Sequence, residues 1–245
     1  MKNRLWLVGL ATLLISVTTV QAHYPWLVIR NEKGKAKVHF YFEEAPRVGD
    51  GYYLDPFLER AKTWVRTVDD PKPQKLILKE TKSVGRRGKK ELKLRWLSGD
   101  LSVKRPRAIS MDCLWDVYTY GKQEILLHYY PRHIDVTNAK ELDVLAGAPH
   151  LDAVLVPRWK GEALEVQLLW KGKPAANRPV RIGGPGKLFK NVRTDNNGKV
   201  SFTPKAKGLH IMRTYVQENE KGKFKSRAYD AIRHHATLTV NLPLK

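Results

Sequence analysis

The sequence is poor in cysteine, in long apolar runs and in acidic residues, and each shortage excludes a class of protein. The single cysteine, Cys113, excludes an internal disulfide framework. Residues 5–20 form the only uncharged apolar run of their length. This run is shorter than the roughly 20 residues that a helix needs to cross a bilayer. Once it is removed, the chain is therefore expected not to span a membrane.

The first 22 residues have the pattern of an export signal. Lys2 and Arg4 give a positive start, residues 5–20 form the apolar part, and Val-Gln-Ala precedes a cleavage point after Ala22. Cleavage there would make His23 the first residue of a periplasmic or secreted protein. Removing the two basic residues of the signal leaves 43 of 45 basic against 24 acidic residues, a net charge of +19.

A strongly basic chain attracts polyanions. Export argues against nucleic acid as a partner, so an anionic surface or polymer is the class that the charge favours. The densest basic stretch is Arg-Arg-Gly-Lys-Lys at 86–90, between two strand-like segments, and it predicts a hairpin tip. The other basic residues are spread along the chain, as on an ordinary solvated surface.

Short segments of alternating apolar and polar residues predict a mostly-β protein with few short helices. Residues 36–43, for example, place Val38, Phe40 and Phe42 on one face. Strands at this spacing, separated by turns, favour two β-sandwich (immunoglobulin-like) domains. The expected division is a signal peptide at 1–22, an N-terminal β-rich domain at 23–157 and a C-terminal β-sandwich at 158–245.

Two helices are expected. Residues 54–65 have Asp55 as a candidate cap and Pro56 at the first helical position. A second short helix or turn is expected at 138–145. Residues 107–113 and 116–120 are expected to form separate strands, and Cys113 is expected to be a buried small hydrophobe.

Motifs in both halves resemble a known family. Trp-Lys-Gly-Lys-Pro at 170–174, Thr-Asp-Asn-Asn-Gly at 194–198 and Phe-Thr-Pro at 202–204 resemble a carboxypeptidase-regulatory-like module. With Ala-His-Tyr-Pro-Trp at 22–26, Leu-Leu-His-Tyr-Tyr at 126–130 and residues 229–239, nearly the whole mature chain resembles the periplasmic domain-of-unknown-function 4198 family.

The resemblance implies a sandwich fold and a periplasmic location. Some members of that family are described as periplasmic components of nickel or cobalt uptake systems, so it also implies a membrane metal transporter as partner. His235 departs from the family pattern, in which an aromatic residue is expected at this point.

An N-terminal histidine would offer two metal ligands, its α-amine and its imidazole. One more histidine would complete a three-nitrogen site, which suits copper(II) or nickel(II). The interpretation depends on cleavage directly before His23. With any other cleavage point, His23 is an ordinary residue.

The candidate partners of His23 in a metal site are His128, His234 and His39, which all lie in strand-like segments. His234 and His235 are adjacent, so their side chains should point to opposite faces of a strand, and at most one can join a given site. His133, His150 and His210 are assigned to loops or edges.

A ligating histidine usually has its second ring nitrogen held by a carboxylate or carbonyl group. Asp230 or Glu43 could serve as that carboxylate.

Motifs of catalytic sites are missing from the sequence. It contains no Gly-x-Ser-x-Gly, His-Glu-x-x-His or Cys-x-x-Cys. Asp-Asn-Asn-Gly at 195–198 has no bidentate acid downstream, so it indicates a turn and not a calcium loop. The chain is therefore expected not to be an enzyme.

Three hypotheses follow. The first is an exported protein that binds nickel, cobalt or copper for uptake or buffering. The second is a non-catalytic module that binds a protein or an anionic polymer. The third is a copper-dependent oxidoreductase with a histidine brace.

Overall fold

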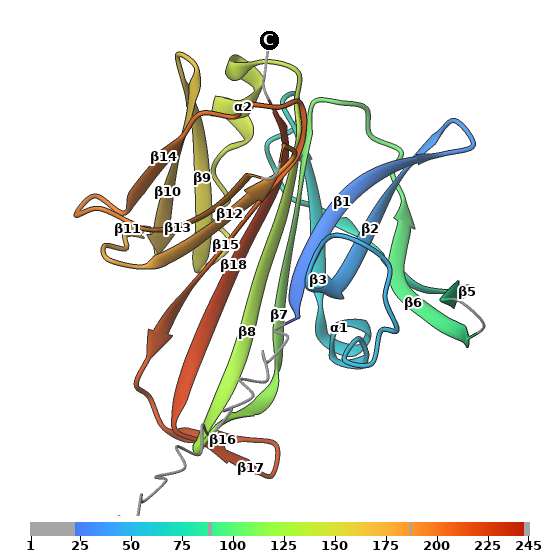
Figure 1. Ribbon diagram of the computed structural model, residues 1–245, viewed down its shortest axis with the longest axis vertical. Helices are drawn as coiled ribbons and strands as arrows, with labels where there is room; N and C mark the ends of the chain where they lie inside the picture. The colour runs from blue at the N-terminus through green and yellow to red at the C-terminus, as the bar shows by residue number, and fades with distance from the viewer. Residues whose placement is uncertain (1–22, 88–89, 187, 243–245) are drawn as a thin grey trace, which may run out of the picture.

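The computed structural model describes residues 23–87, 90–186 and 188–242 (Figure 1). The expected signal peptide and residues 88–89 of the basic hairpin lie outside the described residues. Strands form most of this part of the chain, which confirms the mostly-β prediction. None of the helices in the described ranges is long and apolar enough to cross a membrane.

An eight-stranded sheet forms the middle layer of the molecule (Figure 1). Its order is β13-β12-β15-β18-β8-β7-β3-β4. The strands are β3 (Lys62–Thr67), β4 (Gln74–Leu76), β7 (Arg107–Tyr120), β8 (Gln123–Asp135), β12 (Pro179–Gly184), β13 (Leu188–Arg193), β15 (Gly208–Glu218) and β18 (Ala231–Leu242). β18 runs parallel to β8, and the other neighbouring pairs are antiparallel.

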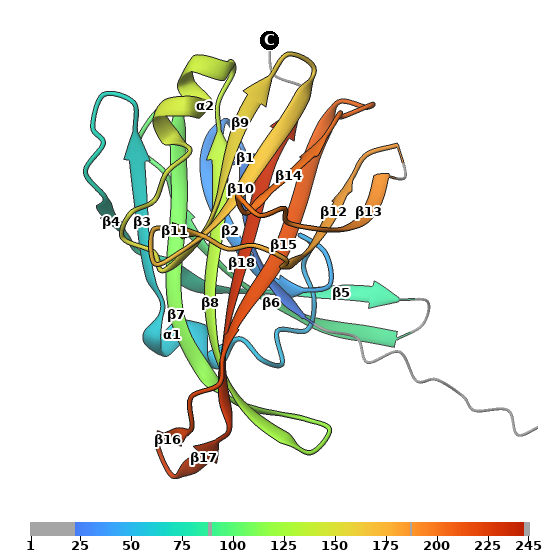
Figure 2. The same cartoon turned by 90° about the vertical axis from the view of Figure 1, so that its left-hand side faces the viewer.

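Smaller sheets cover both faces of this layer, so two β-sandwiches share the central sheet. The first outer sheet has the order β1-β2-β6-β5, with β1 (Tyr24–Glu32), β2 (Lys35–Glu43), β5 (Lys79–Arg87) and β6 (Lys90–Asp100). The second contains β9 (Ala153–Lys160), β10 (Ala163–Trp170), β11 (Lys173–Pro174) and β14 (Lys199–Phe202). A short hairpin, β16 (Gly222–Phe224) and β17 (Arg227–Tyr229), lies at the end of the central sheet away from α2 (Ala139–Leu145) (Figure 2).

The two halves of the chain meet in the central sheet. β18, from the expected second domain, pairs with β8 from the expected first domain. The expected boundary at residue 157 falls inside β9, which pairs with β10 along its whole length. The core of the second sandwich therefore contains residues from both sides of that boundary, and Leu209 and Ile211 pack against the small cluster of Trp26, Val28 and Tyr41.

Alternation along the central strands supplies the two cores. On β8, Leu127 and Tyr129 pack in the first sandwich, and Tyr130 and Ile134 pack in the second. The hydroxyl groups of Thr237 and Thr239 on β18 donate to the carbonyl oxygens of Pro25 and Leu27, at 2.6 and 2.5 Å. These bonds satisfy buried carbonyl groups of the edge strand β1 and hold its first residues against the central sheet.

The prediction of a helix at 54–65 was wrong in its second half. α1 spans Asp55–Arg60, and its N-cap is Leu54, without a side-chain cap. β3 begins at Lys62 because its β-branched and aromatic residues gain more from pairing with β7 and from the burial of Val65 than from continuing the helix.

The second helix, the strand at 107–120 and the basic hairpin agree with the predictions to different degrees. α2 forms as predicted, and the Asn138 side chain accepts a hydrogen bond from the Glu141 amide at 3.0 Å. The predicted separate strands at 107–113 and 116–120 form one strand, β7, with an irregularity between Leu114 and Val117. Arg87 pairs with Lys90, as a hairpin tip at 86–90 requires.

Candidate functional site

The four predicted metal ligands lie at three separate positions. His128 on β8 and His234 on β18 are side by side. His39 on β2 and His23, directly before β1, have other neighbours and do not join them. Within residues 23–242, apart from 88–89 and 187, no group of three His, Cys, Asp or Glu side chains is placed to hold a metal ion.

The parallel pairing of β8 and β18 brings His128 and His234 into register. Their ring centroids are 5.6 Å apart. The Tyr130 hydroxyl lies between them, 2.9 Å from Nδ1 of His128 and 3.2 Å from Nδ1 of His234.

A carboxylate holds the other nitrogen of each ring. Nε2 of His128 lies 2.5 Å from Asp112, and Nε2 of His234 lies 3.0 Å from Glu218. Lys171 binds the second oxygen of Glu218 at 3.0 Å. We call these six residues the inner histidine network: Asp112, His128, Tyr130, Lys171, Glu218 and His234.

The number of ring protons decides which hydrogen bonds this network can form. Each Nε2 donates its hydrogen to a carboxylate, so a neutral ring can only accept at Nδ1. The Tyr130 hydroxyl has one hydrogen and can satisfy one of the two Nδ1 atoms. The other bond forms when one imidazole carries a second proton and donates it to the hydroxyl oxygen.

The surroundings of His234 disfavour a second proton on that ring. Burial, with a smaller contribution from the neighbouring His128, lowers the pKa of His234 to about 4. His128 is more exposed and lies against Asp112. Burial also raises the pKa of Tyr130, which keeps its hydroxyl protonated. Both Nδ1 atoms are thus directed at Tyr130 and are not free to bind a metal.

His39 is held in a similar way on the first outer sheet. Its Nδ1 lies 3.0 Å from the Tyr41 hydroxyl, and its Nε2 lies 3.1 Å from Glu32. The ring stacks on Trp96. Burial lowers the pKa of His39, and Glu32 opposes this shift. These contacts indicate that His39 has a structural role.

His23 differs from the other three. Its Nε2 lies 3.7 Å from a carboxylate oxygen of Glu43, one of the two carboxylates expected to support a ligand. The ring packs beside Phe42 and Tyr53 but keeps 27% of its side-chain surface exposed. Burial raises the pKa of Glu43, and the charge of His23 opposes the rise. The other expected carboxylate, Asp230, instead accepts the amide hydrogen of Glu124 at 3.2 Å.

His235 has a role that sequence reasoning did not find. As predicted, it points to the face opposite to His234. There its ring stacks on Tyr129 and meets Tyr24 and Tyr215, with centroids 5.2, 5.9 and 5.7 Å away. Neither ring nitrogen has a hydrogen-bond partner among the described residues. The sequence did contain a hint of this role, since the family pattern has an aromatic residue at this position. The surroundings of His235 are those of an aromatic core side chain.

Three further histidines are mainly structural. His133 and His210 lie on inner strands of the central sheet, so their assignment to loops or edges was wrong. His133 bonds Thr239 at 2.7 Å. His150 does lie in a loop, and its Nε2 is 2.9 Å from the Ser110 hydroxyl.

Cys113 is buried, as predicted. Burial raises the pKa of its thiol to about 12, so the thiolate that binds soft metals is not formed at neutral pH.

Comparisons with known proteins add nothing to this picture. No protein-family model matches the sequence, and no match was found among curated proteins. The resemblance to the periplasmic domain-of-unknown-function 4198 family therefore stays a prediction.

Proposed function

We propose that this protein is exported to the periplasm and binds one nickel, cobalt or copper ion through the α-amine and the imidazole of His23. It would serve metal uptake or buffering, without a reaction of its own. The observation that supports this proposal is the Glu43 carboxylate beside Nε2 of His23. The separation of 3.7 Å is longer than a hydrogen bond, and the negative charge of Glu43 on this side of the ring favours the tautomer with hydrogen on Nε2, which leaves Nδ1 as the free lone pair.

The free nitrogen is the one that a terminal chelate needs. Nδ1 is separated from the α-nitrogen of the same residue by few bonds, so both atoms can bind one ion in a small ring. Nitrogen ligands suit copper(II) and nickel(II). None of the other predicted histidines approaches His23, so the remaining coordination positions are open to water or to a partner. Open positions suit transfer of the ion to a membrane metal transporter.

The test begins with mass spectrometry of the exported protein, which shows whether His23 is its first residue. Calorimetric titration of that form with nickel(II) and copper(II) should give one site. A single alanine added before His23 converts the amine into an amide and should weaken binding by more than about 100-fold. Unchanged affinity in the extended form would remove the proposal.

Glu43→Gln tests the supporting carboxylate. This substitution should lower the affinity for the metal by about 10-fold or more, as is usual for a group that holds a metal-binding side chain in place. Glu32→Gln is a matched control, because Glu32 holds His39 in the same sheet. The control should bind metal normally. Peroxide formation with copper and a reductant would instead favour the oxidoreductase hypothesis.

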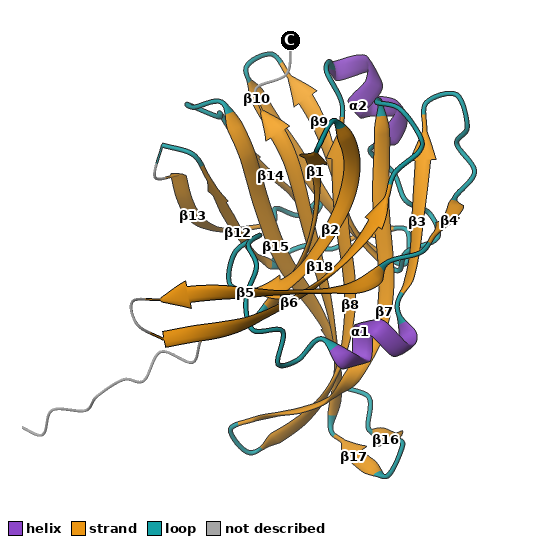
Figure 3. Cartoon of the chain, turned by 90° about the vertical axis from the view of Figure 1, so that its right-hand side faces the viewer, coloured by secondary structure: helices purple, strands orange, loops and turns teal. Residues whose placement is uncertain are grey.

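The β5–β6 hairpin favours a second candidate function, binding to an anionic polymer or surface. It runs across the direction of β8 and β18 and projects beyond the layers (Figure 3). Exposed Lys82, Arg86, Lys90 and Lys93 lie along it. Salt-sensitive, metal-independent retention on heparin that is lost in Lys82→Gln/Lys93→Gln would support this function. Equal retention of both proteins would count against it.

A further inference from the structure

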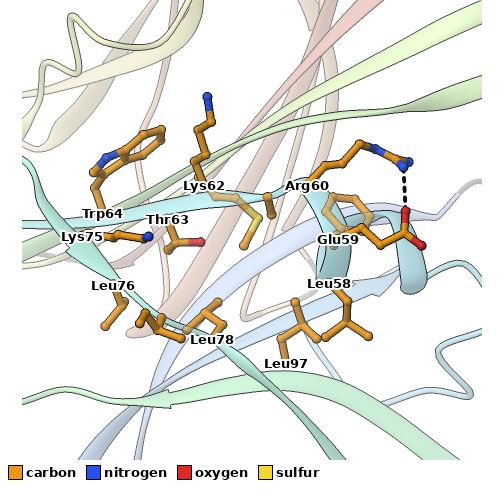
Figure 4. A pocket seen from close by; sticks show the side chains of 14 residues that line it. Leu58, Glu59, Arg60, Lys62, Thr63, Trp64, Lys75, Leu76, Leu78 and Leu97 are labelled. Atoms are coloured by element: carbon orange, nitrogen blue, oxygen red, sulfur yellow. Dashed lines mark hydrogen bonds and ion pairs between the residues drawn. The ribbon is translucent and has the colours of Figure 1, made fainter. Parts of the chain in front are cut away.

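Two hollows in the surface differ in what lines them. The larger, of about 580 Å³, lies beside α1, β3 and β4 (Figure 4). Its walls include Phe57, Leu97 and Met111 of the first sandwich core, and the Lys62 side chain points away from it. Walls of this kind would accept many apolar groups and identify none of them. The smaller, of about 210 Å³, is lined by two arginines and restricts its ligand more. We call it the arginine hollow.

The arginine hollow lies where β12 and β13 extend the central sheet past the edge of β1. Arg181 on β12 and Arg213 on β15 are direct partners in the antiparallel register. Val180, Ile182 and Met212, which alternate with them, enter the second sandwich core. Both arginine side chains therefore lie on the opposite face of the sheet, side by side, and both line the hollow.

The two guanidinium groups have no anionic partner of their own. Neither forms an ion pair or a side-chain hydrogen bond in the part of the chain that the structure describes. Like charges directly opposite each other on neighbouring strands destabilise a sheet. Burial lowers the pKa of Arg213, and the charge of Arg181 contributes to this decrease. An anion bound between the two groups would offset the repulsion.

An aromatic ring holds Arg213 in place. Its guanidinium carbon lies 3.6 Å from the centroid of the Tyr24 ring. Tyr24 in turn packs beside Trp26, with ring centroids 6.4 Å apart. A guanidinium group stacked on a ring face still has its N–H groups, which lie in its own plane, available as donors. Arg213 is therefore a fixed donor, and the exposed Arg181 can adjust to a ligand.

The uncharged part of the lining is shaped for a flat group. Gly183 pairs with Phe189 on one side and with Ile211 on the other, and all three line the hollow. Since Gly183 has no side chain, the space between the phenylalanine and the isoleucine stays open. Phe189 is 65% exposed at this point, and the buried Trp26 closes the side toward β1. A ring placed over Gly183 would cover the exposed face of Phe189.

The charged part of the lining favours a ligand with one negative charge. Glu44 is exposed and also lines the hollow, without forming an ion pair to either arginine among the described residues. Two arginines and one glutamate give a sum of +1. A monoanion complements this sum better than a phosphate dianion does. A carboxylate also matches guanidinium groups, because it accepts two parallel N–H bonds.

We infer that the arginine hollow binds a small aromatic monocarboxylate, with the carboxylate between Arg181 and Arg213 and the ring over Gly183 against Phe189. A hollow of about 210 Å³ is smaller than the roughly 300–1,000 Å³ of most pockets for drug-sized ligands, so a single ring with a short side chain is the expected size. The site does not use His23 and does not depend on the proposed metal function.

Calorimetric titration of the protein with 3-phenylpropionate tests the inference. We expect one saturable site. Propionate, which lacks the ring, and 3-phenylpropanol, which lacks the charge, should each bind more weakly by about tenfold or more. Phenyl phosphate should also bind more weakly. The inference is overturned if 3-phenylpropionate does not saturate a site, if the alcohol binds equally well, or if phenyl phosphate binds more tightly.

Arg181→Gln tests the carboxylate position. Arg181 is exposed, so the substitution should leave the fold intact, and it should weaken 3-phenylpropionate by about tenfold. Arg86→Gln is the matched control, because Arg86 is also exposed and lies on β5, outside the hollow. It should leave binding unchanged. Equal losses in the two variants would show attraction to the general basic surface and would overturn the site.

Glu44→Gln tests the charge balance. Removing the one negative charge of the lining should strengthen 3-phenylpropionate by about threefold at low salt. Weaker binding in this variant would contradict the assignment of a monoanion.

Two exposed aromatic residues test the ring position. Phe189 is 65% and Tyr52 is 75% exposed, but only Phe189 lines the hollow. Phe189→Ala should weaken 3-phenylpropionate by about tenfold and leave propionate unchanged, and Tyr52→Ala should change neither. If Phe189→Ala has no effect, the aromatic part of the inference is wrong. Circular dichroism of each variant checks that the fold is retained.

Discussion

His23 and the inner histidine network share one half of their surroundings and differ in the other. In both places a carboxylate lies beside Nε2: Glu43 for His23, and Asp112 or Glu218 for the inner pair. At Nδ1 the two places differ. Tyr130 holds both inner Nδ1 atoms, whereas Nδ1 of His23 adjoins the α-nitrogen of its own residue.

The difference teaches that two neighbouring histidines do not by themselves form a metal site. A ligand needs a lone pair that no other group uses, and it needs access to solvent. The inner pair has carboxylates and proximity but no free lone pair. His23 has partial exposure and a supporting carboxylate. His235, with no hydrogen-bond partner at either nitrogen, is a third environment against which both can be measured.

The largest effect is expected from His235→Phe at acid pH. Burial lowers the pKa of His235 to about 3, below the value of about 6.5 in an unfolded chain. Between these values the unfolded chain takes up a proton that the folded chain does not, so His235 makes stability fall as the pH falls from about 6.5 to about 3. The difference in unfolding free energy between the phenylalanine variant and the original protein should therefore be larger at pH 4 than at pH 7, in favour of the variant, by on the order of 3 kcal/mol.

Urea unfolding at the two pH values measures this gain. Val144→Ala is the control, because this exposed side chain carries no titratable group, and it should leave the pH dependence of the unfolding free energy unchanged. If His235→Phe retains the full acid sensitivity of the original protein, the buried aromatic environment assigned to His235 is wrong.

Tyr130→Phe should have the next largest effect. The change keeps the buried ring and removes the hydroxyl that both Nδ1 atoms contact, which leaves buried polar atoms without a partner. We expect a loss of about 2 kcal/mol in the free energy of unfolding at pH 7. Tyr52→Phe, at a side chain that is 75% exposed, should change it little. Equal losses in the two variants would argue against a bridging hydroxyl.

Glu218→Gln should have a smaller effect. Glu218 is partly exposed and binds both His234 and Lys171, and an amide can still accept one of the two bonds. We expect a loss of about 1 kcal/mol in unfolding free energy. A double-mutant cycle with Lys171→Met measures how much of this loss comes from the lysine. A cycle that assigns the whole loss to Lys171 would separate His234 from the network.

The smallest effect concerns Cys113, a soft ligand that is as inaccessible as the inner pair. Its pKa of about 12 and its burial predict almost no reaction with a thiol reagent at neutral pH in the folded protein. The thiol should react fully in urea. Rapid, complete labelling of the folded protein would show that this thiol is accessible to metals as well.

Much of the fold could be predicted because strand alternation and turns are local signals. The faces of His128, His234 and His235 followed from alternation alone. The helix at 54–65 was wrong after Arg60 because pairing with β7, a distant segment, decides the conformation of β3. The shared central sheet could not be predicted, because it depends on β8 pairing with β18 more than 100 residues later in the chain.

The candidate site shows the same limit. Glu43 was named as one of two carboxylates for any ligating histidine, but its place beside His23 follows from the pairing of β1 with β2, which only the structure gives. The meeting of His128 and His234 on Tyr130 needs the register of two distant strands, which the sequence does not state. The cavity near α1 was not foreseen, since it arises from the short strand β4 at a sheet edge.

The ring signals of the histidines, followed by NMR while copper(II) is added to the chain that begins at His23, compare all these environments in one measurement. Copper(II) broadens the signals nearest to it. We predict that the His23 ring signals disappear first, well before one equivalent, while those of His128 and His234 persist. Earlier loss of the His128 and His234 signals would contradict the account and would place the metal in the inner histidine network.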